Sequence, residues 1–106
     1  MILTGKEAAA MIDISLVRTQ HTISDIRDVV ELAKKYRFIN VHVLPCWVAN
    51  LAEMLHDVGG VYVGSPVGFP SGAATTLTKV VEAEQLIRDG VEEMDVVMNI
   101  GKLKAG

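Results

Sequence analysis

The chain has 106 residues, of which 50% are hydrophobic and 22% charged, and its formal net charge is −3. This length corresponds to one small domain, and the apolar content excludes a disordered tail. The slightly acidic balance argues against a nucleic-acid partner, which would require a basic face. No apolar run approaches the ~20 residues of a membrane span, and no secretory signal is visible at the N-terminus. The single cysteine, Cys46, excludes an internal disulfide and fits a reducing compartment, so we expect a cytoplasmic domain without membrane partners.

In the first half of the chain, apolar periodicity predicts strands that alternate with helices. A possible helical turn over residues 6–9 precedes a short strand over residues 10–16. Residues 22–37 have the spacing of an amphipathic helix, and Thr22 with Asp25 resembles a capping box. A β-branched run over residues 39–44 predicts a strand, which a proline ends.

The second half continues the alternation. A helix is expected from Val48 onward, with Gly59-Gly60 as its stop. Residues 61–64 begin a third strand, which runs into the glycine-rich loop 68–72, and residues 94–98 predict a fourth strand. Between them a helix begins near Thr76 and stops at Gly90. Its inward face is expected to carry Leu77, Val80, Ala83 and Ile87.

The predicted order is β-α-β-α-β-α-β, which indicates right-handed units and a parallel sheet. The strands are nearly continuous apolar runs, as expected for a sheet that is covered on both faces. The sequence stops soon after the fourth strand, with no covering helix predicted there. We therefore expect an incomplete architecture with open strand edges, and such edges favour association with another copy or another chain.

Asp95 is the sharpest candidate for a functional residue, because it interrupts the apolar strand Met94–Met98. Burial of an unpaired carboxylate costs several kcal/mol, and ligand sites of α/β folds form at the carboxyl ends of strands. Asp13, between two isoleucines, is a weaker candidate of the same kind. The structural alternatives are a strand-end cap for Asp95 and a helix cap or turn for Asp13.

Other candidates are weaker. His42, within an apolar strand, is expected to be a satisfied core residue, and Cys46 a small buried hydrophobe rather than a reactive thiolate. The loop 68–72 and the following helix offer amides for an anion, but they match no established phosphate motif. Lys102 and Lys104 are expected to be a solvated surface pair. The three histidines have no spacing that suggests a metal site.

Four segments together resemble the deoxyribose-phosphate aldolase family. They are residues 12–16 (IDISL), 43–45 (VLP), 67–72 (VGFPSG) and 93–101 (EMDVVMNIG), in the family's order across nearly the whole chain. The resemblance implies the first half, about four strands, of a TIM (β/α)8 barrel spanning residues 1–106. It also implies a class I aldolase that needs no metal or other cofactor. Such enzymes use a lysine Schiff base to interconvert 2-deoxyribose 5-phosphate with acetaldehyde and glyceraldehyde 3-phosphate.

By this resemblance, Asp95 matches the family's catalytic aspartate, which assists proton transfer beside the active lysines. Asp13 matches the polar residue of the first strand, which supports the lysine network. The chain departs from the family pattern at Ile14, where a histidine is usual, and at His42 and Leu44, where cysteine and asparagine are usual. The Schiff-base lysine of the family lies on the sixth strand, its partner lysine on the seventh, and the phosphate grip on the last strands. All of these lie beyond this sequence.

Three readings remain open. The chain is the N-terminal half of an aldolase whose partners are a small phosphorylated aldehyde or sugar substrate and the missing C-terminal half. Alternatively, it is a non-catalytic half-barrel that associates with itself, as a homo-oligomer, or with a second half. A third, weaker reading is a different phosphate-handling half-barrel that grips its ligand with the loop 68–72.

Overall fold

A computed structural model describes residues 2–106, in which four strands form one parallel sheet in the order β1-β2-β3-β4. The strands are β1 (Asp13–Leu16), β2 (Asn40–Val43), β3 (Tyr62–Val67) and β4 (Glu93–Val96). The connecting helices are α2 (Ile23–Tyr36), α3 (Val48–Leu55) and α4 (Thr76–Asp89). A 3₁₀ turn, η1 (Pro45–Trp47), leads into α3. The predicted alternation of strands and helices is confirmed.

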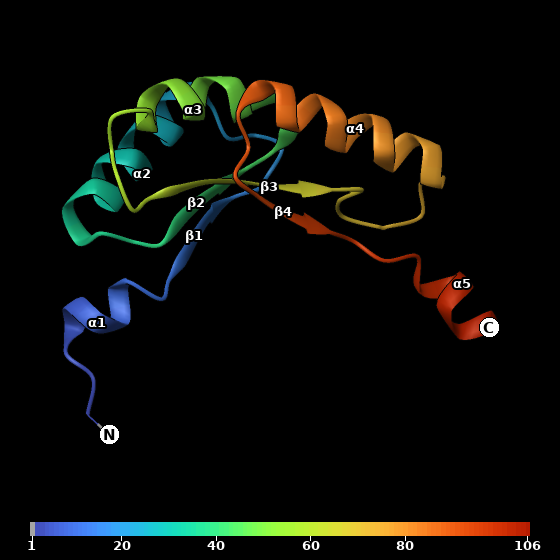
Figure 1. Cartoon of the computed structure of the whole chain (residues 1–106), viewed down its shortest axis with the longest axis horizontal. Helices are drawn as coiled ribbons and strands as arrows, with labels where there is room; N and C mark the ends of the chain where they lie inside the picture. The colour runs from blue at the N-terminus through green and yellow to red at the C-terminus, as the bar shows by residue number, and fades with distance from the viewer. Residues whose placement is uncertain (1) are drawn as a thin grey trace.

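Two short helices lie outside this alternation. Helix α1 (Gly5–Ala9) precedes β1, close to the predicted turn, and α5 (Ile100–Ala105) follows β4. Helices α2, α3 and α4 lie together on one side of the sheet, whereas α1 and α5 project from its two ends (Figure 1). Every residue of α5 is exposed, so this helix, which the sequence did not predict, covers neither face of the sheet.

The strands alternate between an apolar face and a polar face. Side chains that point toward the helices join one buried core with Ile26, Val30, Leu51 and Leu86. The opposite face carries Asp13, Ser15, Asn40, His42, Glu93 and Asp95, which the parallel register places at alternate positions. The expectation of strands covered on both faces was therefore wrong, because within residues 2–106 helices cover only one face.

Local signals explain where α2 begins and ends. The backbone amide and hydroxyl of Thr22 both donate to the carboxylate of Asp25, at 2.7 and 2.9 Å. The helix ends at Arg37, which adopts the left-handed conformation with φ 60°. One stripe of the helix buries Ile26, Val30 and Ala33 against the sheet. The predicted helix and its capping box are confirmed.

Helix α3 ends earlier than predicted. Its last residue is Leu55 and its C-cap is His56, so the pair Gly59-Gly60 does not stop the helix. Gly60 instead takes a φ of +81° in the turn that leads to β3. Gly90 does end α4, with a φ of +98°, as predicted.

Helix α4 buries a different face from the predicted one. Leu77, Val80 and Ile87 are 73%, 47% and 60% exposed, and Ala83 alone of the four predicted residues packs on the core. Leu86 is the buried residue of this helix. Helix α4 packs against β3 and α3, and among the described residues no other helix covers its outer flank.

Candidate active site

The candidate site lies on the polar face of the sheet, across strands β2, β3 and β4. Residues that alternate along one strand share a face, and the register sets them beside their partners on the next strand. Gly64 of β3 is the register partner of both His42 on β2 and Glu93 on β4. Because Gly64 has no side chain, polar side chains of β2 and β4 can reach each other across β3.

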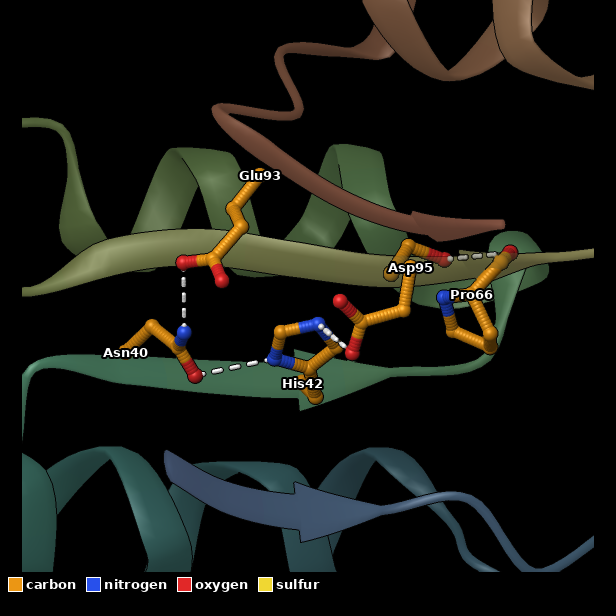
Figure 2. Close-up of polar contacts among 6 residues, drawn as sticks. Asn40, His42, Pro66, Glu93 and Asp95 are labelled. Carbon is orange, nitrogen blue, oxygen red and sulfur yellow. Dashed lines mark hydrogen bonds and ion pairs between the residues drawn. The ribbon is translucent and has the colours of Figure 1, made fainter. Parts of the chain in front are cut away.

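Four side chains, Asn40 and His42 from β2 and Glu93 and Asp95 from β4, form a series of polar contacts on this face of the sheet (Figure 2). The amide Nδ2 of Asn40 donates to Glu93 Oε2 at 2.7 Å. The Oδ1 of the same amide lies 2.8 Å from His42 Nδ1, and His42 Nε2 lies 3.1 Å from Asp95 Oδ2. This last contact has the distance of an ion pair, but it is not aligned as a hydrogen bond, and Nε2 has no other polar partner among the described residues.

The four contacting side chains differ in how far they are buried. Asn40 and His42 are almost completely buried, although they lie on the face that no described helix covers. The side chain of Asp95 is 67% exposed. The expectation that its carboxylate is buried was wrong, because β4 is an edge strand. Asp95 does lie near the carboxyl end of β4, where α/β folds bind ligands.

The environment of Asp95 permits proton transfer with a small molecule. One side of the carboxylate faces the imidazole of His42, and the other is open to solvent. A carboxylate within reach of both a bound molecule and an imidazole can accept or deliver a proton. No lysine or arginine of the described residues forms an ion pair with Asp95.

Asp13 lies on the same face but apart from Asp95. It is the first residue of β1 and the register partner of Asn40, whereas Asp95 is the partner of Pro66 on β3. Its side chain is exposed, and it does not cap a helix. The two candidate carboxylates thus share a face of the sheet without touching each other.

The loop after β3 is held by its own contacts. Gly68 and Gly72 adopt φ values of +70° and +67°, and the amide of Gly72 donates to the carbonyl of Gly68 at 2.8 Å. The Gly68 amide donates to Glu82 Oε1 at 2.8 Å, and Lys79 Nζ donates to the carbonyl of Val97 at 2.7 Å. Two side chains of α4 therefore bind this loop and the residue that follows β4, and Glu82 occupies the Gly68 amide that an anion would otherwise use.

The remaining candidates lie away from this chain of contacts. Cys46 is exposed, contrary to expectation, because the 3₁₀ turn after Pro45 directs it outward. Lys102 and Lys104 are exposed, as predicted for a surface pair. Across residues 2–106, no group of three or more histidine, cysteine or acidic residues is arranged to hold a metal ion. None of the described helices is long and apolar enough to cross a membrane.

The roles of Asn40 and Glu93 were not predicted from the sequence. His42 is buried, as predicted, but it is not the satisfied core residue that was expected, because its Nε2 has no hydrogen-bond partner among the described residues. The signal that could have identified these residues is period-two spacing, since Asn40 lies two residues before His42 and Glu93 lies two residues before Asp95. Two polar pairs at this spacing indicate one polar face.

Comparison with curated proteins gives deoxyribose-phosphate aldolases over almost the entire chain. The chain is 49% identical over 105 residues to the deoxyribose-phosphate aldolase of Klebsiella pneumoniae, covering 97% of this chain and 42% of that protein. It is 43% identical over 104 residues to that of Sinorhizobium medicae, with 98% and 42% covered. The chain thus spans less than half the length of the relatives that it matches. No family model matches the chain.

Solved structures agree in fold. A putative deoxyribose-phosphate aldolase from Coccidioides immitis superposes with a TM-score of 0.92 at 31% identity, over 97% of this chain and 40% of that one. The tetrameric deoxyribose phosphate aldolase of Aeropyrum pernix gives 0.87 at 29% identity, over 93% and 42%. The four-stranded parallel sheet is accordingly consistent with half of a barrel. In sequence and in fold, the chain corresponds to the N-terminal part of the deoxyribose-phosphate aldolase family, as its motifs predicted.

Proposed function

We propose that the protein that contains this chain catalyses the reversible aldol cleavage of 2-deoxyribose 5-phosphate to acetaldehyde and glyceraldehyde 3-phosphate. The observation that carries the proposal is the 49% identity to an aldolase, together with an aspartate of the matching motif on an open polar face. In this proposal the Schiff-base lysine and its partner lysine lie outside these 106 residues. No metal or cofactor takes part.

Asp95 is assigned the proton-transfer role. An aldol step requires a proton to leave and return to carbon and oxygen atoms of the substrate, and a positioned carboxylate accelerates such transfers by about 10²–10⁴-fold. Asp13 is assigned a supporting role. A carboxylate beside a pair of lysines keeps one ammonium charged while its neighbour remains neutral and nucleophilic.

The remainder of the barrel is proposed to close on β4 and α4. Strand β4 has a free edge, since its only described strand partner is β3. Beside it lies an apolar hollow of about 260 Å³, lined mainly by Val67, Val80, Ala83 and Val96. A further strand and helix would fill this hollow and cover the exposed flank of α4. The parts that complete the site are then a C-terminal half and a small phosphorylated aldehyde or sugar.

A cytoplasmic location belongs to the same proposal. It is supported by Cys46, a free thiol and the single cysteine of the sequence, which fits a reducing compartment. Homo-oligomerisation is also proposed, in analogy to the relative from Aeropyrum pernix whose structure is described as tetrameric.

The test is reduction with borohydride in the presence of 2-deoxyribose 5-phosphate, followed by intact-mass spectrometry. The intact protein is expected to gain a covalent adduct, and the 11.5 kDa chain expressed alone is expected to gain none. The Asp95→Asn variant of the intact protein should lose turnover, because the proton-transferring carboxylate is gone. An intact protein that forms no adduct and cleaves no substrate would contradict the proposal.

A non-catalytic half-barrel is the second candidate, and the exposed apolar flank of α4 favours it. Such a module would bury that flank against a second copy. In that case the purified 106-residue chain would be a stable dimer by light scattering, without any adduct after borohydride treatment. The aldolase proposal instead expects the flank to be covered by the following segment of the same protein.

A further inference from the structure

We propose that His42 is a positioning residue that holds one proton against the carboxylate of Asp95, as a buried imidazolium–carboxylate pair. The pair itself follows from the contacts of the described residues, whereas its effect on catalysis rests on the proposed aldolase function.

The orientation of Asn40 follows from Glu93. A carboxylate only accepts hydrogen bonds, so the amide group that faces Glu93 Oε2 at 2.7 Å must be the NH₂ of Asn40. The carbonyl oxygen of Asn40 then faces His42 Nδ1, at 2.8 Å. Because that oxygen only accepts, Nδ1 carries a hydrogen and donates it.

The state of Nε2 follows from Nδ1. A neutral imidazole carries one ring proton, so an Nδ1–H form leaves a lone pair on Nε2. That lone pair would face the Asp95 carboxylate across 3.1 Å, inside the protein and without another partner. Two acceptors in such contact repel each other, and a buried acceptor without a donor loses the hydrogen bond that it would make to water. A proton between Nε2 and Oδ2 removes both penalties.

The charges around the imidazole agree with this assignment. Its neighbours along the register are Ser15 on β1 and Gly64 on β3, which are uncharged. From β4, the carboxylates of Glu93 and Asp95 complete the chain of contacts. No lysine or arginine forms a hydrogen bond or an ion pair with any of the four side chains, among the residues that the structure describes.

The backbone of β3 leaves room for the ring. A Cβ atom placed on Gly64 would overlap the imidazole of His42, and its distance to Cγ would be 2.8 Å. The ring therefore occupies the place of a side chain at position 64. This is a second observation, independent of the hydrogen bonds, that the imidazole has a fixed position in the sheet.

For the proposed reaction, this pair fixes one oxygen of Asp95 toward the protein and leaves the other toward the open face. The His42 proton stabilises the ionised carboxylate, which can then accept a proton from the substrate side. When Asp95 returns that proton to the substrate, the pair is restored to its original state, so the cycle neither gains nor loses a proton.

The first test is nitrogen NMR of the intact protein labelled with ¹⁵N-histidine at pH 7. We expect both ring nitrogens of His42 to be protonated. In the Asp95→Asn variant, the introduced amide donates to Nε2, and we expect the neutral form protonated only at Nδ1. The exposed His56 is the internal control and should not change. A neutral His42 in the unsubstituted protein, or one protonated only at Nε2, would overturn the inference.

The second test separates positioning from folding. The conservative variant His42→Gln is expected to lower kcat by about tenfold, with KM changed less than about twofold, and to alter the pH profile of kcat. The matched control is His56→Gln, which should have the kinetics of the unsubstituted protein. An unaltered pH profile in folded His42→Gln would overturn the catalytic role. If the unsubstituted protein has no aldolase activity, the proposed function fails, and the NMR result still decides the proton pair.

Discussion

The imidazole of His42 fills the space beside the Cα of Gly64, its register partner on the neighbouring strand. Glycine is required here by close approach and not by backbone conformation, because the φ of Gly64 is not in the left-handed region. The polar contacts of the candidate site thus depend on the absence of a side chain at position 64. This dependence couples the packing of β3 to the geometry of Asp95.

We expect Gly64→Ala to lower the free energy of unfolding by about 1–3 kcal/mol, the usual cost of overpacking. The new methyl group must displace a buried ring that is held by Asn40. Urea denaturation of the intact protein measures the change. The control is Gly5→Ala, since nothing lies within 4 Å of a Cβ at that position. If overlap with the imidazole is the cause, Gly64→Ala should lower the free energy of unfolding much less in a His42→Ala background. An equal loss in both backgrounds would show that the imidazole is not the cause.

The capping box of α2 predicts a pH-dependent contribution to stability. Hydrogen bonds from the backbone and hydroxyl of Thr22 lower the pKa of Asp25 in the folded protein. The folded state therefore binds this proton less readily than the unfolded state. The contribution is fully present above the unfolded pKa, about 4, and is lost as the pH falls through the lower folded value.

Asp25→Ala should accordingly be less stable than the unsubstituted protein at pH 7, and the difference should shrink below about pH 4. Asp28→Ala is the matched control, an exposed residue of the same helix whose side chain is outside the capping box. Denaturation curves at several pH values measure both variants. A difference for Asp25→Ala that does not vary between pH 7 and pH 3 would argue against the capping contribution.

The side chain of Lys79 ties α4 to the end of β4 through its bond to the Val97 carbonyl. Lys79→Met keeps much of the aliphatic stem that packs on Gly68 but removes the donor. We expect a loss of about 1.5–3 kcal/mol in the free energy of unfolding, the usual range for a hydrogen bond that involves a charged group. Lys104→Met, on the exposed helix α5, should stay within about 0.5 kcal/mol of the unsubstituted protein. Equal losses in the two variants would contradict the role of this bond.

The order of elements could be predicted because its signals are local. Thr22, Asp25 and Gly90 mark helix ends through contacts within a few residues, and apolar periodicity identifies the strands. The end of α3 was predicted too late, because its C-cap is His56, a residue type with no strong preference for that position.

The candidate site could be predicted only in part, because its contacts depend on strand register. Asn40 and Glu93 are separated by 53 positions in the sequence, and no local pattern shows that they meet. Asp95 and Asp13 were identified as polar interruptions of apolar runs. Whether Asp95 is buried depends on what lies beyond β4, which its own segment does not specify.

The flank of α4 gives a test of barrel closure with two residues of the same type. Val80 and Val81 are similarly exposed here, at 47% and 52%, but Val80 alone lines the apolar hollow beside Val67 and Val96. If a following strand and helix close on this side, Val80 becomes buried. In the intact protein, Val80→Ala should then cost about 1–2 kcal/mol, since each buried methylene contributes about 0.8 kcal/mol.

Val81→Ala should stay within about 0.5 kcal/mol, because it lies outside the hollow. Chemical denaturation of both variants in the intact protein gives the comparison directly. Equal and small effects would mean that nothing covers the hollow, and the proposed completion of the barrel on β4 would have to be abandoned. A loss confined to Val80→Ala would mean that the hollow is covered in the intact protein, as the proposed closure of the barrel on β4 and α4 requires.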